Sequence, residues 1–169
     1  MNPYLIQDLP GFSPQIARLV AMMNYARTTT LHAVRGLTQS QLDHLQDAES
    51  NSIGALLAHI ASVEFAYQLI TFEGRDLNVE EMQHWGAPLD LGSAARQDLR
   101  DKPLEHYTRM LEDLRAVTLR EFAKRTDDWL YTQSAWGPGT ANYYFMWFHV
   151  MEDELSHRGQ IRWLRKRLP

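Results

Sequence analysis

Apolar residues recur every three or four positions along four long segments of this 169-residue chain. That period places them on one face of an α-helix, and long runs of alternating β-branched residues, which would indicate strands, are missing. The pattern predicts an all-α four-helix bundle in which each amphipathic helix buries its apolar stripe against the others. The predicted helices run from about Ser13 to Arg35, from Asn51 or Ser52 to Glu73, from just after Asp101 to Lys124 and from Ala141 to Lys166.

Residues that start and stop helices support these bounds. Ser13 followed by Pro14 is typical of a helix N-terminus, and Gly36 and Gly74 are typical of positions just after a C-terminus. One long connection is predicted between the second and third helices. It spans 75–100 with short helical candidates at 79–85 and 94–99, and a loop is predicted over 126–140 with its turn at 136–139.

The composition excludes several classes of protein. No linker or repeat divides the chain, so residues 1–169 are expected to form one domain. The formal net charge of −4 argues against nucleic-acid binding. No apolar run is expected to reach the roughly 18 residues of a membrane span, and residues 1–12 lack a signal-peptide pattern. We therefore expect a cytoplasmic protein without a nucleic-acid or membrane partner.

The chain contains seven histidines and no cysteine. The missing thiol excludes a cysteine nucleophile, an iron–sulfur cluster and a disulfide framework, and it leaves histidine and carboxylates as the strong metal ligands. A chain of this length forms a core without a structural metal, so a bound metal would serve a functional site.

One face of the fourth predicted helix carries His149, Asp153 and His157. Residues four apart stand one helical turn apart, so imidazole and carboxylate groups at this spacing can bind the same divalent ion. The face continues through Ile161 and Leu164, which indicates that it turns inward.

A third ligand would have to come from another helix. His59 is the candidate, since it lies within the apolar run from Ala55 to Val63. A buried imidazole needs either a hydrogen-bond partner or a metal. The residues alone leave both interpretations open: a metal site, or a core of hydrogen-bonded polar side chains.

The remaining candidates are weaker. His149 suits either a ligand or a hydrogen-bond partner of a ligand, and Glu152 is a candidate outer acceptor or general base. Glu152 and Glu154 are otherwise expected to be exposed or paired with arginines. Four histidines are predicted to lie outside any metal site, namely His32, His44, His84 and His106.

Three stretches of the chain resemble the DinB/YfiT superfamily of small four-helix-bundle proteins, including its DUF664-type branch. They are Gly36–Leu42, Asn51–Glu64 and, most specifically, His149–Ile161. The resemblance implies a metal site with one ligand on the second helix and two, four residues apart, on the fourth. Carried over, these positions are His59, Asp153 and His157, with Asp153 where histidine is more usual.

The same resemblance implies zinc or nickel as the metal, with iron or manganese as alternatives. It further implies a thiol-dependent transferase or a metal-dependent hydrolase, whose thiol would be a low-molecular-weight cosubstrate because the chain has none. Catalytic residues are not assigned. The alternative is a non-catalytic binding or dimerisation protein without metal. A homodimer is expected in either case, since the aromatic residues at 143–148 could pack in an interface.

Overall fold

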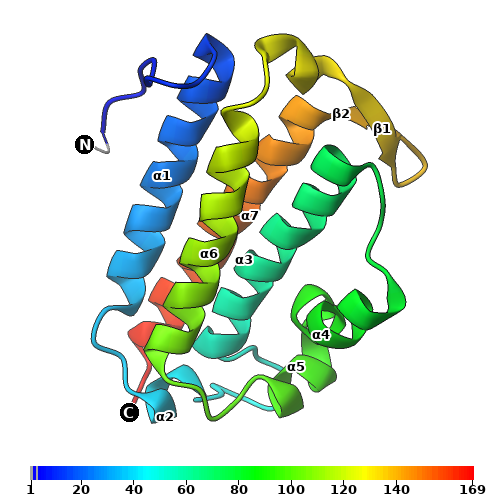
Figure 1. Ribbon diagram of the computed structural model, residues 1–169. Helices are drawn as coiled ribbons and strands as arrows, with labels where there is room; N and C mark the ends of the chain where they lie inside the picture. The colour runs from blue at the N-terminus through cyan, green and yellow to red at the C-terminus, as the bar shows by residue number, and fades with distance from the viewer. Residues whose placement is uncertain (1, 3) are drawn as a thin grey trace.

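The computed structural model describes residue 2 and residues 4–169 and is predominantly helical, as the periodicity predicts. Four long helices lie side by side (Figure 1). In Figure 1, α1 and α7 run in one direction and α3 and α6 in the other. Their bounds are α1 (Pro14–Val34), α3 (Ile53–Gln68), α6 (Leu104–Phe122) and α7 (Tyr143–Arg165).

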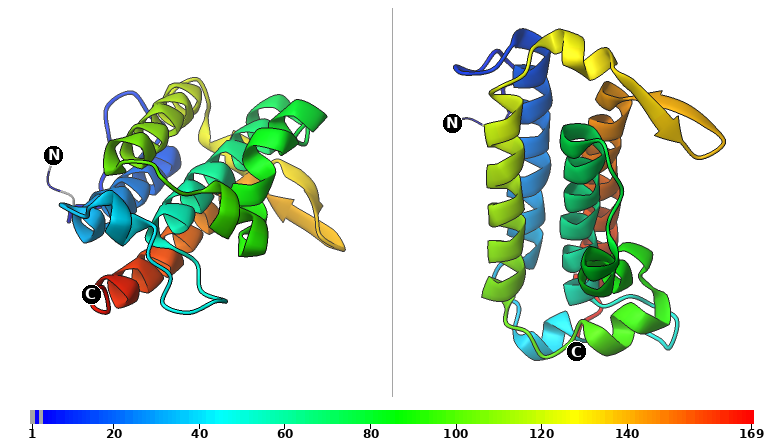
Figure 2. Two further views of the ribbon diagram at one scale, coloured as in Figure 1. Left: turned by 90° about the horizontal axis from the view of Figure 1, so that it is seen from below. Right: turned by 45° about the vertical axis from the view of Figure 1, so that its right-hand side comes forward.

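Shorter elements complete the fold. Helix α3 continues into a π-helical turn, and α4 and α5 lie outside the four long helices on the α3 side (Figure 2). A two-stranded antiparallel hairpin projects at the end of the molecule where α7 begins. The bounds are α2 (Gln39–Leu42), the π-helical turn (Leu69–Glu73), α4 (Val79–Asp90), α5 (Gly92–Asp98), a 3-10 turn (Asp127–Tyr131), β1 (Gln133–Trp136) and β2 (Gly139–Asn142).

Two sequence-based assignments are wrong. The predicted loop over 126–140 contains the 3-10 turn and most of the hairpin, whose four-residue strands are too short and too polar to show a two-residue period. Helix α4 runs to Asp90 rather than stopping near Trp85. Gly86 and Pro88 do not end it because both are buried in the packing of α4 on α3, and such packing overrides local propensity.

The apolar stripes predicted for the first two helices are buried. Both predicted stops are also confirmed, since Gly36 and Gly74 adopt positive φ angles of 75° and 69°. A Cβ on Gly54 would come within 2.7 Å of Tyr107 Oη, so glycine permits the close approach of α3 and α6. The buried stripes comprise Ile16, Leu19, Val20, Met23, Ala26, Thr30 and Val34 of α1 and Ile53, Leu56, Leu57, Ile60, Val63 and Tyr67 of α3.

The segment Ile53–Glu73 is long and apolar enough to cross a membrane by length and composition, contrary to the expectation from the sequence. However, 83% of its most apolar window is buried inside the structure. The core helix of a soluble protein passes the same test, so burial accounts for the apolar composition of this segment.

Each long helix also contributes one charged residue to the interior: Arg27, Glu64, Arg115 and Glu154, here called the Arg–Glu quartet. Arg27 Nε donates to Glu154 Oε1 at 3.0 Å, and Arg115 Nε donates to Glu64 Oε1 at 2.8 Å. Arg27 Nη2 donates to Glu64 at 2.9 Å. The Nη1 atoms of both arginines donate to backbone carbonyls, so the buried charges are paired and hydrogen-bonded, as burial requires.

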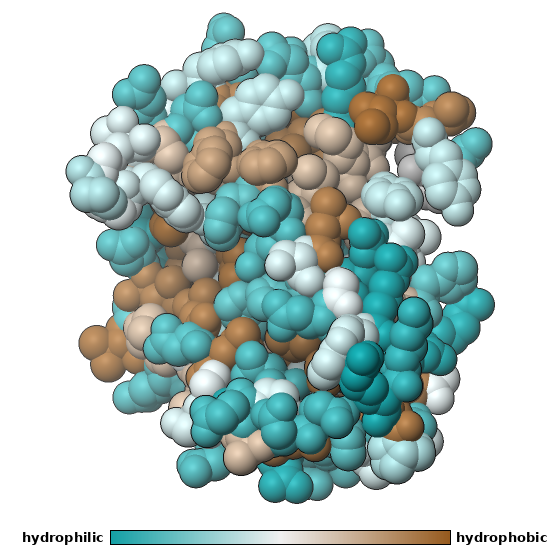
Figure 3. Space-filling view, turned by 180° about the vertical axis from the view of Figure 1, so that it is seen from behind, coloured by the Kyte–Doolittle hydropathy of each residue, from teal (hydrophilic) through white to brown (hydrophobic). Residues whose placement is uncertain are grey.

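Large hydrophobic side chains are also exposed. Seen from behind, the molecule shows hydrophobic residues in separate patches among hydrophilic ones (Figure 3). On α7, Met146 and Trp147 are buried, whereas Phe145 and Phe148 remain exposed. The aromatic residues at 143–148 thus divide between the core and the surface.

Candidate metal centre

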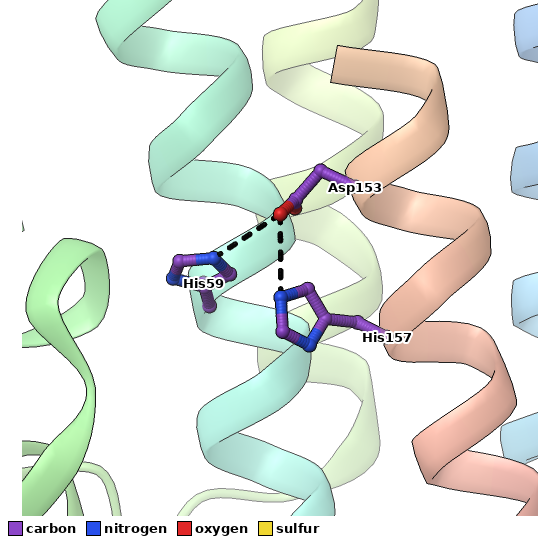
Figure 4. A group of neighbouring side chains, drawn as sticks. All are labelled: His59, Asp153 and His157. Carbon is purple, nitrogen blue, oxygen red and sulfur yellow. Dashed lines mark ion pairs between the residues drawn. The ribbon is translucent and has the colours of Figure 1, made fainter. Parts of the chain in front are cut away.

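Helices α3 and α7 bring His59, Asp153 and His157 together (Figure 4). One ligand atom from each residue lies within 4.8 Å of the others. Asp153 Oδ1 lies 3.5 Å from His59 Nε2 and 3.3 Å from His157 Nε2. The three side chains are between 12% and 15% exposed, so the cluster is largely buried.

The position of each residue in this cluster depends on local helix geometry and on helix packing. Asp153 and His157 are one turn apart on α7, so their side chains lie on the same face. His59 reaches them because α3 packs directly against α7. The N-terminus of α3 is capped by Ser52, whose Oγ accepts from the Ala55 backbone N–H at 3.1 Å.

The two distances from Asp153 to the histidines are compatible with a shared metal ion. Both N···O separations exceed the usual upper limit of about 3.2 Å for an N–H···O hydrogen bond. Two ligands at about 2.1 Å from a tetrahedral ion lie about 3.4 Å apart, which matches both separations. In addition, Asp153 Oδ2 is buried without a hydrogen-bond partner. The residues therefore fit a divalent ion.

Helix α4 orients the His59 ring. His59 Nδ1 lies 2.8 Å from the Pro88 carbonyl oxygen, which can only accept, so Nδ1 carries the proton and donates. Nε2 then presents its lone pair toward Asp153. A ligating histidine typically makes a bond of this kind through its second ring nitrogen.

Charge interactions within the cluster shift two pKa values. Burial alone would raise the pKa of Asp153, but its polar contacts with His157 and His59 lower it well below its usual range. Burial alone would lower the pKa of His59, but Asp153 and the Pro88 carbonyl raise it above its ordinary value. Asp153 is therefore ionised at neutral pH.

The weaker candidates lie outside the cluster. His149 is one turn before Asp153, and its Nδ1 lies 3.2 Å from Tyr67 Oη; its ring contacts Trp136 of the hairpin edge-on. Glu152 is exposed. Glu154 is buried and forms ion pairs with Arg27 and Arg115. Of the two alternatives predicted for Glu154, pairing with arginines is therefore the one that the structure shows.

Among the described residues, none of the four histidines set aside from the sequence joins the cluster, namely His32, His44, His84 and His106. The sequence analysis missed the Pro88 carbonyl and the Arg–Glu quartet. A backbone acceptor leaves no signal in side-chain identity. The Arg–Glu quartet did leave a signal in the sequence, because Arg27 and Glu64 lie among the apolar residues on the inward faces of α1 and α3.

Comparison with known proteins identifies the family. A family model described as mycothiol-S-transferase matches residues 18–169, which include all four long helices except the first turn of α1. No curated protein matches the chain significantly.

Proposed function

Since the chain belongs to the mycothiol-S-transferase family, a DinB/YfiT-like family, we propose that it is a metal-dependent enzyme that transfers a small-molecule thiol to a second substrate. The proposed ligands are His59, Asp153 and His157. Zinc or nickel is the proposed metal, with iron or manganese as alternatives.

The observation that carries this proposal is the spacing around Asp153 Oδ1. Its distances of 3.5 and 3.3 Å to the two Nε2 atoms are close to the edge length of a tetrahedral site and long for hydrogen bonds, which supports the proposal. Three protein ligands leave a fourth position for a substrate, which is the arrangement of catalytic rather than structural zinc sites.

A divalent ion bound there would hold the cosubstrate thiol as its thiolate at neutral pH. Two residues of the cluster, His59 and Asp153, have features that favour the binding of such an ion. In the neutral His59 ring, donation of Nδ1–H to Pro88 leaves the lone pair on Nε2, where it can bind a metal ion. Asp153 stays ionised and supplies one negative charge, which would attract a cation to the cluster. The partly buried position limits competition by water.

The thiol must come from outside, because the chain has no cysteine. A thiol that binds as thiolate releases one proton, and that release can be measured. The described residues fit this role without a protein nucleophile, since the reacting sulfur belongs to the cosubstrate.

Metal analysis of untagged protein tests the proposal. We expect one equivalent of zinc or nickel in wild type after reconstitution, none in His59→Ala or His157→Ala, and unchanged content in His106→Ala, which lies outside the cluster. Addition of mycothiol at pH 7 in weak buffer should release one proton per site from the metal-loaded wild type and none from the metal-free protein.

Two results would contradict the proposal. Equal metal loss in all three variants would refute the ligand assignment. No metal uptake by wild type, together with a melting temperature that a chelator leaves unchanged, would instead favour the non-catalytic binding or dimerisation protein.

Three further features are proposed on the family assignment. We assign the packing of α1, α3, α6 and α7 to the DinB-like four-helix bundle, place the protein in the cytoplasm, and propose a homodimer. The exposed Phe145 and Phe148 support an interface on α7. Sedimentation that finds only monomer at tens of micromolar would refute the dimer.

A further inference from the structure

A cavity lies outside the metal cluster, where α4, the connection after α5 and α6 meet α3. Its volume is about 360 Å³. Ala58 of α3, Trp85 of α4 and Met110 of α6 contribute apolar walls, and the buried Tyr107 also lines it. A cavity of this size with mainly apolar walls is typical of a small-molecule site.

Three basic side chains from three places in the chain line the same cavity: His84 of α4, Lys102 of the connection and His106 of α6. All three side chains are exposed, and none of them forms an ion pair or a side-chain hydrogen bond with any residue that the structure describes. Asp98 also lines the cavity and is not paired with them.

The charges of Lys102 and His84 act on His106. Burial lowers the pKa of His106, and the charges of Lys102 and His84 lower it further. Neighbouring like charges destabilise one another's protonated forms. An anion between them would relieve that repulsion and accept charge-assisted hydrogen bonds.

We propose that this cavity binds a small organic acid. The apolar body of the ligand contacts Trp85, Tyr107 and Met110, and its carboxylate accepts hydrogen bonds from Lys102, His106 and His84. A planar body suits the aromatic walls, and the carboxylate of Asp98, which also lines the cavity, favours a ligand with no more than one negative charge.

The cavity adjoins the metal cluster without sharing its ligands. Ala58 directly precedes His59, and Pro88, whose carbonyl accepts from His59 Nδ1, also lines the cavity. A bound acid would therefore contact the residues that hold the His59 ring. Because none of the proposed metal ligands lines the cavity, binding can be tested on metal-free protein, and its result is independent of the proposed transferase activity.

Benzoate is the probe, with neutral benzamide as its matched control, titrated into metal-free protein at constant ionic strength and followed by NMR. We expect saturable shifts of the Trp85 indole signal and the His84 and His106 imidazole signals with millimolar benzoate, and about tenfold weaker binding of benzamide. Lys102→Met should weaken benzoate binding about tenfold, whereas Lys166→Met, which removes the same charge from the end of α7, should leave it unchanged.

Three outcomes would overturn the proposal: equal affinity for benzoate and benzamide, equal effects of Lys102→Met and Lys166→Met, or shifts confined to residues outside the cavity. Lys102 is exposed, so its substitution leaves the core intact, and an unchanged spectrum without ligand will verify that the variant is folded.

Discussion

The Arg–Glu quartet and the His59–Asp153–His157 cluster both place ionisable groups between the long helices, but they leave different numbers of polar atoms unpaired. No buried side-chain nitrogen or oxygen of the quartet lacks a partner. In the cluster, Asp153 Oδ2 and His157 Nδ1 are buried and unpartnered. Glu64 is fully buried, whereas Asp153 is 15% exposed.

The difference separates a structural polar network from a site that can take a ligand. In the quartet two cations meet two anions, so its charge is balanced and its hydrogen bonds are complete. In the cluster one carboxylate faces two imidazoles and its Oδ2 has no hydrogen-bond partner, and a divalent ion bound by the three residues would balance that carboxylate charge. We therefore expect the quartet to govern stability and the cluster to govern metal binding.

The largest expected effect comes from removing one charge of the quartet. Glu64→Gln leaves two buried guanidinium groups with one carboxylate, and we expect the free energy of unfolding to fall by about 3–5 kcal/mol in urea denaturation. The matched substitution Glu152→Gln, on the exposed face of α7, should change it by less than about 0.5 kcal/mol.

The same amide substitution in the cluster completes the comparison. Asp153→Asn in metal-free protein should lower the free energy of unfolding by only about 1 kcal/mol, because the group is partly solvated and its contacts are long. A loss as large as that of Glu64→Gln would show that the cluster, too, is a structural network.

The pH dependence of stability should distinguish the two regions. Burial alone would raise the pKa of Glu64, but Arg115 and Arg27 lower it to about 2. A carboxylate with a lowered pKa stabilises the folded protein when the pH is above its unfolded-state pKa of about 4.3. That stabilisation is lost as the pH falls through its folded-state pKa. The quartet should therefore contribute equally at pH 5 and pH 8.

In the metal-free cluster the raised pKa of His59 works in the opposite sense. Its contribution is complete below the unfolded-state value of about 6.5 and is lost as the pH rises through the folded-state value. Asp153, with its lowered pKa, contributes above about 3.9. Asp153→Asn should therefore cost more at pH 5 than at pH 8, measured by urea denaturation with a chelator. An equal cost at both pH values would contradict this assignment.

The smallest effect is expected one turn away from the cluster. His149→Gln removes an imidazole that contacts Tyr67 Oη, a single partly buried hydrogen bond, so the free energy of unfolding should fall by about 0.5–1 kcal/mol. Metal content should not change. Loss of the metal in this variant would make His149 a ligand, an alternative that the sequence leaves open.

Some of the site follows from spacing that is local to one helix. Asp153 and His157 share a face of α7 because residues four apart always do, and the buried stripes of α1 and α3 follow from the same period. The side chain opposite them could be suggested, as His59 was, only from its apolar surroundings. The spacing of one helix carries no information about which residues of another helix it meets.

Other contacts depend on residues far apart in the chain. Ser13 is the N-cap residue of α1, as its sequence suggests, but its side chain makes no cap bond within the helix. Instead the Asp127 carboxylate, from the 3-10 turn, accepts from the backbone N–H groups of Gln15 and Ile16 and from Ser13 Oγ. Asp127 lies in the segment that was predicted to be a loop.

The sequence by itself determined the helical class, the buried stripes and the candidate ligands, because helix periodicity and capping act between residues within a few positions of one another. Only the tertiary structure decided that Arg27, Glu64, Arg115 and Glu154 meet in the interior, that the Pro88 carbonyl orients His59, and that His84 and His106 line one cavity with Lys102. These contacts depend on how separate helices pack, and packing is set by the whole core rather than by any one segment.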